Sequence, residues 1–99
     1  MEFERRKDTV IAHLGGELDH CSARQVRLEL DRLIEDRAVK RLVLDMRGMT
    51  FMDSSGIGVI LGRYRELRAR GGTVAVRNMT PPVQRIFLLA GMNQVIDIL

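Results

Sequence analysis

Cysteine, histidine and aromatic residues are scarce in this chain of 99 residues, and each shortage excludes a class of protein. The single cysteine, Cys21, cannot close an internal disulfide, which is typical of proteins from a reducing compartment. Two histidines and one cysteine show no metal-ligand spacing, so we expect neither a metal site nor a cofactor. We therefore turn to functions that need no bound group.

Long apolar runs are also missing. No run approaches the ~20 apolar residues that a membrane span requires, and Met1 to Arg5 has no apolar core of the kind found in a signal peptide. We expect a cytoplasmic protein that does not enter a membrane. Hydrophobic content of 45% and charged content of 29% predict one globular domain over residues 1–99.

The basic charge balance raises the question of nucleic-acid binding. The net charge is +3, and Arg63, Arg65, Arg68 and Arg70 cluster late in one predicted helix. One tyrosine and three phenylalanines leave no pattern of aromatic and basic residues for base stacking. Cations near a helix C-terminus also complement the helix dipole. We therefore expect no direct contact with nucleic acid.

Apolar spacing and turn formers predict alternating strands and helices. The order β-β-α-β-α-β-α-β predicts an α/β fold, with a mixed, mostly parallel sheet flanked by helices and one antiparallel hairpin. The expected strands cover residues 4–7, 10–14, 42–44, 73–76 and 95–98. The expected helices begin near Ser22, Ser54 and Pro81.

Several local signals define the ends of these elements. Ser22 and Gln25 have the spacing of a capping box, and Gly15-Gly16 is expected to end the second strand. Apolar residues at helical spacing predict the buried faces of the first and third helices. These residues are Val26, Leu30, Leu33 and Ile34 in the first helix, and Val83, Ile86, Phe87 and Ala90 in the third.

The topology predicts where a binding site lies. Parallel strands bring their C-terminal ends to one edge of the sheet, and open α/β sheets bind ligands at that edge. Loops 15–21 and 45–53 both leave strands there. We call this end of the molecule the pole. We expect it to bring together Asp19, His20, Asp45, Asp53, Ser54 and Ser55.

No catalytic arrangement accounts for these residues. Gly56, Gly58 and Gly62 are spaced one residue too long for a dinucleotide fingerprint, and no P-loop lysine is present. Serine, histidine and aspartate occur together, but the G-x-S-x-G nucleophile elbow is absent. We therefore expect a protein that is not an enzyme.

Asp53, Ser54 and Ser55 precede the second helix and allow two interpretations. Asp and Ser are common N-cap residues. An exposed serine at a helix start could also carry a phosphate, which the helix dipole and free N–H groups would tolerate. Met49, Phe51 and Met52 come directly before, either as part of the core or as an exposed contact surface.

Two segments resemble a known family. Gly16-Glu17-Leu18-Asp19-His20 and the run from Phe51 through Asp53-Ser54-Ser55-Gly56 to Leu61-Gly62-Arg63-Tyr64 are similar to the STAS domain. Within that family they most resemble the anti-sigma factor antagonists of sporulation, and the Leu-Gly-Arg-Tyr segment favours these over the general-stress antagonists. The resemblance covers nearly the whole chain.

The resemblance implies a regulatory protein without catalytic activity. The unmodified antagonist would bind an anti-sigma factor, a serine kinase of the GHKL type, and so release the sporulation sigma factor. The kinase would phosphorylate Ser54, and a metal-dependent serine phosphatase would remove the phosphate. The partner-binding residues implied are Asp19, Met52, Asp53, Ser55, Gly56, Gly58 and Arg63.

Other members of the family leave alternatives open. A STAS module can sense a nucleotide or a lipid, act in the general-stress pathway, or form part of an anion transporter. The family also continues past the last strand into a C-terminal helix, and this sequence departs from that pattern by stopping at Leu99.

Overall fold

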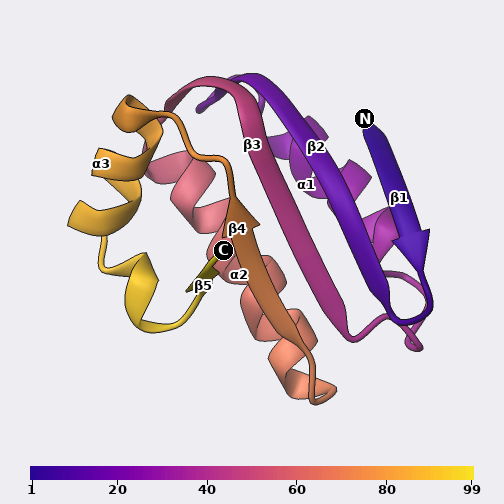
Figure 1. Cartoon of the computed structure of the whole chain (residues 1–99). Coiled ribbons are helices and arrows are strands. Elements are labelled where there is room, and N and C mark those ends of the chain that lie inside the picture. The colour runs from indigo at the N-terminus through magenta and orange to yellow at the C-terminus, as the bar shows by residue number, and fades with distance from the viewer.

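The computed structural model describes residues 1–99 and confirms the predicted order of elements (Figure 1). The elements are β1 (Glu2–Arg6), β2 (Thr9–Leu18), α1 (Ala23–Leu33), β3 (Arg41–Met52), α2 (Ser54–Ala69), β4 (Thr73–Arg77), α3 (Pro81–Leu89), the 3-10 helix η1 (Met92–Gln94) and β5 (Asp97–Ile98). None of the helices combines the length and apolar character that crossing a membrane requires.

The strands form one five-stranded sheet in the order β1-β2-β3-β4-β5. Only β1 is antiparallel to its neighbour, and the hairpin between β1 and β2 turns at Lys7, whose φ is 58°. All other pairs are parallel, as the crossover helices predict. Figure 1 shows α1 and α2 packed behind the strands.

One hydrophobic core joins the sheet to all three helices. The predicted stripe of α1 is confirmed, with Leu30 and Ile34 fully buried against the central strands. From α3, Val83 and Phe87 enter the same core. The prediction was wrong for Ala90, which is the C-cap residue of α3 and is exposed, because the helix ends there.

The two central strands extend further than the sequence predicts. Gly15-Gly16 does not end β2, and residues 45–52 of the predicted loop 45–53 belong to β3. Two bulges in β3, opposite the steps from His13 to Gly15 and from Gly16 to Glu17, keep the strands paired as far as Leu18 and Met52. Gly16, in β2 opposite these bulges, has φ +71°, a left-handed conformation that glycine adopts readily. The pair β2–β3 therefore continues well past the end of β4 at Arg77.

Three further local predictions need correction. Ser22 is the N-cap of α1, but its hydroxyl makes no cap hydrogen bond, because it donates to the Glu17 carbonyl at 2.8 Å. Gln25 does not complete a capping box and donates instead to Glu29 at 3.1 Å. The first strand begins at Glu2, and residues 92–94 form a 3-10 turn that shortens the last strand.

Candidate functional site

The extended ends of β2 and β3 carry the predicted site. Leu18 and Met52 are paired at the end of this two-stranded extension, and both are buried. The loop before α1 follows Leu18 directly, and the start of α2 follows Met52. The extension therefore holds the N-termini of α1 and α2 next to each other at one end of the molecule.

Asp53 is the residue that joins these two helix starts. It is the N-cap of α2, and its Oδ1 accepts hydrogen bonds from the N–H groups of Ser55 at 2.8 Å and Gly56 at 3.3 Å. Its Oδ2 accepts a third from the N–H of His20 at 3.3 Å. One carboxylate thus caps α2 and fixes the loop that leads into α1.

Asp19 stabilises the loop before α1 by accepting hydrogen bonds from backbone N–H groups of that loop. Its Oδ1 accepts hydrogen bonds from the N–H groups of Cys21 at 2.9 Å and Ser22 at 3.0 Å, the pattern of an Asx turn. The hydrogen bond from the Ser22 N–H, helped by that from Cys21, lowers the pKa of the Asp19 carboxyl below its ordinary value. The carboxylate stays ionised at neutral pH and holds the loop closed.

The two serines after Asp53 differ in exposure. Ser54 is the first residue of α2, is exposed, and its hydroxyl makes no hydrogen bond within the chain. Ser55 is half-buried and lines a hollow between α1 and α2. Ser54 therefore offers the more accessible hydroxyl, at the end of α2 where the helix dipole favours added negative charge.

Three of the predicted contact residues lie at different depths. Met52 is 1% exposed, so it belongs to the core and offers no contact surface, whereas Phe51 beside it is 46% exposed. Gly56 is buried, and a Cβ there would lie 2.6 Å from Met52 Cγ and 2.7 Å from the Leu18 carbonyl oxygen. Gly58 is exposed, and a Cβ there would meet no atom within 4 Å. Only Gly58 of these two glycines is open to a partner.

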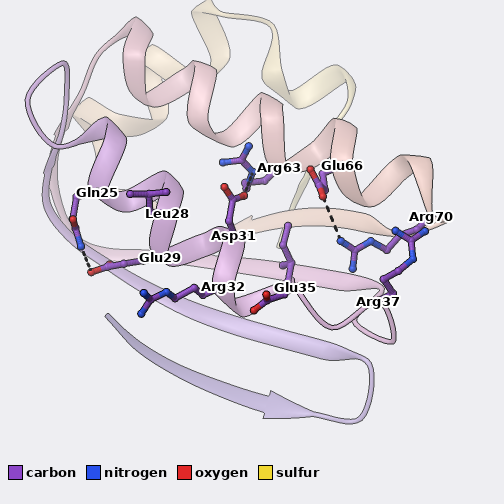
Figure 2. Close-up of a pocket in the computed structure, with 11 residues that line it drawn as sticks. Gln25, Leu28, Glu29, Asp31, Arg32, Glu35, Arg37, Arg63, Glu66 and Arg70 are labelled. Atoms are coloured by element: carbon purple, nitrogen blue, oxygen red, sulfur yellow. Dashed lines mark hydrogen bonds and ion pairs between the residues drawn. The ribbon is translucent and has the colours of Figure 1, made fainter.

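Arg63 lies away from the two serines, in a charged groove between α1 and α2. Figure 2 shows it facing Asp31 across that groove, and its Nε lies 3.2 Å from Asp31 Oδ1. The residue is 9% exposed, and its Nε and Nη1 have no hydrogen-bond partner. This arrangement ties the two helices together, so the first role that the geometry gives Arg63 is structural.

Asp45 does not join the pole, contrary to expectation. β3 continues past it for seven residues, to Met52, and its carboxylate instead accepts hydrogen bonds from Arg77 Nε at 2.9 Å and Asn78 Nδ2 at 3.2 Å. Burial raises the pKa of this carboxyl, but hydrogen bonds from the Arg47 N–H, Arg77 and Asn78 outweigh that effect and hold the pKa below its ordinary value. The Nε2 atom of the nearby His13 lies 3.1 Å from Glu4 Oε2.

The sequence reasoning missed two arginines close to the serines. Arg24 and Arg27, on the first two turns of α1, line the same hollow as Ser55 and Gly58. A signal was present, because a cation in the first turn of a helix opposes the helix dipole. No acidic residue occupies that turn to compensate.

The fold and this pole define an α/β domain with a mostly parallel sheet, which displays a free serine hydroxyl at a helix start. The family model of the STAS domain matches residues 1–99, so the chain belongs to the STAS domain family. An anti-sigma F factor antagonist from Paenibacillus polymyxa is 40% identical to the chain over 98 residues, which cover 99% of the chain and 84% of that relative.

Two solved structures are similar in fold and sequence. The anti-sigma factor antagonist SpoIIAA in its unphosphorylated form matches with a TM-score of 0.84 and 34% identity, over 99% of this chain and 86% of that one. The Bacillus cell fate determinant SpoIIAA in its phosphorylated form matches with a TM-score of 0.75 and 33% identity, over 99% of this chain and 89% of that one.

Proposed function

We propose that this chain is an anti-sigma factor antagonist that is switched off by phosphorylation of Ser54. The observation that carries the proposal is the exposed hydroxyl of Ser54, free of hydrogen bonds, at the first position of α2. In this reading the unmodified chain binds an anti-sigma factor and releases a sigma factor. The Leu61 to Tyr64 segment favours the sporulation pathway over the general-stress pathway.

The partners proposed are two enzymes with opposite effects. The anti-sigma factor is a GHKL-type serine kinase that transfers the γ-phosphoryl group of ATP to Ser54. A metal-dependent serine phosphatase removes the phosphate and restores binding. The chain itself has no catalytic role and acts as their substrate in the cytoplasm, as one domain of residues 1–99.

The partner-binding surface proposed is the exposed part of the pole. It centres on Ser54 and includes Ser55, Gly58 and the outer sides of Asp19 and Asp53. Met52 and Gly56 support this surface from behind, because both are buried. Arg63 contributes from a distance, because its ion pair with Asp31 holds α2 against α1. A phosphate adds about −1.5 to −2 charges beside Asp53, and like charges brought together at an interface cost several kcal/mol.

Incubation with a cognate anti-sigma kinase and ATP tests this function, with the phosphosite mapped by mass spectrometry. We expect one phosphate on Ser54, none on the Ser54→Ala variant, and retained phosphorylation of Ser55→Ala. Since Ser55→Ala removes a neighbouring hydroxyl without touching Ser54, it is the matched control. Phosphorylation that persists in Ser54→Ala would refute the assignment.

A further inference from the structure

A hollow lined by Ser55, the residue after Ser54, has a basic side with no role in the surface described so far. It separates the first turns of α1 and α2 and has a volume of about 380 Å³. Arg24, Arg27 and His20 form one side, and Ser55, Gly58 and Val59 form the other. Both arginines are exposed, and neither makes a hydrogen bond or an ion pair within the chain.

Two residues that face each other across this hollow are unfavourable for their own helices. Arg24 stands in the first turn of α1, where the helix dipole disfavours a cation. Gly58 stands in the interior of α2, where glycine destabilises a helix relative to alanine. No neighbour requires the glycine, because a Cβ there would meet no atom within 4 Å.

Residues that disfavour their own helix, and that no contact within the fold explains, indicate a role in binding another molecule. The two unfavourable residues, Arg24 and Gly58, shape the same hollow in complementary ways. Gly58 keeps the hollow open, and Arg24 together with Arg27 makes it basic. A chain segment with carboxylate side chains fits both features, since it needs space at the helix surface and cations with free donors.

We propose that this hollow is the docking point for an acidic segment of the anti-sigma factor, and this rests on the function proposed above. Carboxylates of that segment pair with Arg24 and Arg27, and its backbone passes over Gly58. The position also accounts for the switch. A phosphate on the adjacent Ser54 repels the acidic segment and competes for the same arginines.

Charge reversal at the arginines tests the proposal by measuring affinity for the anti-sigma factor and thermal stability together. Arg24→Glu with Arg27→Glu should weaken binding about tenfold or more, while the melting temperature stays level or rises, because an acidic first turn suits the dipole. Raising the salt concentration should weaken the wild-type complex more than the variant complex.

Arg32→Glu is the matched control for the charge reversal. It makes one such reversal on the same helix, but in the last turn and outside the hollow, and it should leave affinity within about twofold of the wild type. Arg24→Glu alone is the single reversal to compare with it, and it should weaken binding more. Gly58→Leu tests the space independently of charge. It should raise the melting temperature and weaken binding, because leucine favours the helix and fills the hollow.

Three results would overturn the proposal. They are unchanged affinity in the double arginine variant, an equal loss in Arg32→Glu, or a loss that appears only when ATP is present, which would assign the hollow to the nucleotide. Wild-type protein that neither binds the anti-sigma factor nor accepts phosphate on Ser54 would instead refute the proposed function itself. The two failures are therefore distinguishable.

Discussion

The backbone N–H of His20 donates a hydrogen bond to Oδ2 of Asp53 at 3.3 Å, across 33 positions of sequence. Oδ1 of the same carboxylate caps α2. The loop before α1 and the start of α2 are therefore held in place by one side chain. A change at Asp53 is expected to alter both segments together.

Replacing Asp53 with alanine should lower the free energy of unfolding by about 1–2 kcal/mol, because both the N-cap and the contact to His20 are lost. Asp53→Asn retains an acceptor oxygen and should lose much less. Urea unfolding measures the stability, and hydrogen exchange at His20 and Ser55 reports the local effect. Exchange that increases only in α2 would show that the link to His20 carries no stabilisation.

Two glycines of α2 should respond to alanine in opposite directions. Gly56→Ala places a methyl group less than 3 Å from Met52 and Leu18, so the end of the β2–β3 extension must move and stability should fall by about 1–3 kcal/mol. Gly62→Ala meets no atom within 4 Å and should gain about 0.5–1 kcal/mol. Denaturant midpoints compare the two. A stable Gly56→Ala variant would contradict the close packing described here.

The pair of Asp31 and Arg63 predicts an asymmetry between its two partners. Asp31→Ala leaves the buried guanidinium without its carboxylate and should cost about 1–2 kcal/mol, less than for a fully buried pair because Asp31 is half exposed. Arg63→Met replaces the charge by an apolar side chain of comparable length and should be nearly neutral. A double-mutant cycle on unfolding free energies measures the coupling. Equal losses from both single changes would assign Arg63 a contribution beyond this pair.

Much of the fold could be predicted because its signals are local. The apolar run Leu42 to Leu44, the stripe on α1 and the glycine that follows α2 each depend on residues close in sequence. The continuation of β2 past Gly15-Gly16 could not be predicted. Paired glycines are typical of turns, and only the pairing with β3 shows that Gly16 continues the strand opposite the bulges.

In the candidate site, too, features set by neighbouring residues could be predicted, and features set by contacts between distant segments could not. Asp53 as an N-cap follows from its neighbours, but its bond to His20 depends on two strand ends meeting in space. Asp45 was misplaced for the same reason, since its distance from Asp53 depends on how far β3 continues. Met52 and Gly56 are buried and so do not belong to the contact surface. Their burial could not be predicted, because a sequence pattern of small and apolar residues does not show which of them reach the protein surface.

Acid should destabilise the protein through carboxylates whose folded pKa lies below the unfolded value. Asp45 has a lowered pKa in the folded chain, so its stabilisation is fully present above about pH 4 and is lost as the pH falls through the folded pKa. Asp45→Asn should therefore reduce stability by about 1–3 kcal/mol at neutral pH and flatten the decline below pH 4. Thermal melts between pH 2.5 and 7 measure both effects. An unchanged slope in the variant would exclude Asp45 as a contributor.

Negative charge at position 54 should separate stability from partner binding. Ser54→Asp places a carboxylate at the first residue of α2, where the helix dipole favours it by about 0.3–1 kcal/mol, so the melting temperature should not fall. Affinity for the anti-sigma factor should fall at least tenfold, about 1.4 kcal/mol or more, because the added charge lies beside Asp53.

Ser54→Asn is the matched control, because asparagine has nearly the same shape as aspartate but no charge. This variant should bind the anti-sigma factor more tightly than Ser54→Asp. Crystal structures of the phosphorylated and unmodified chain complete the test. We expect the backbone of residues 19–22 and of α2 to superpose in the two forms, because Asp53 keeps its three hydrogen bonds. A large backbone rearrangement would show that the switch works through conformation rather than through charge at the surface.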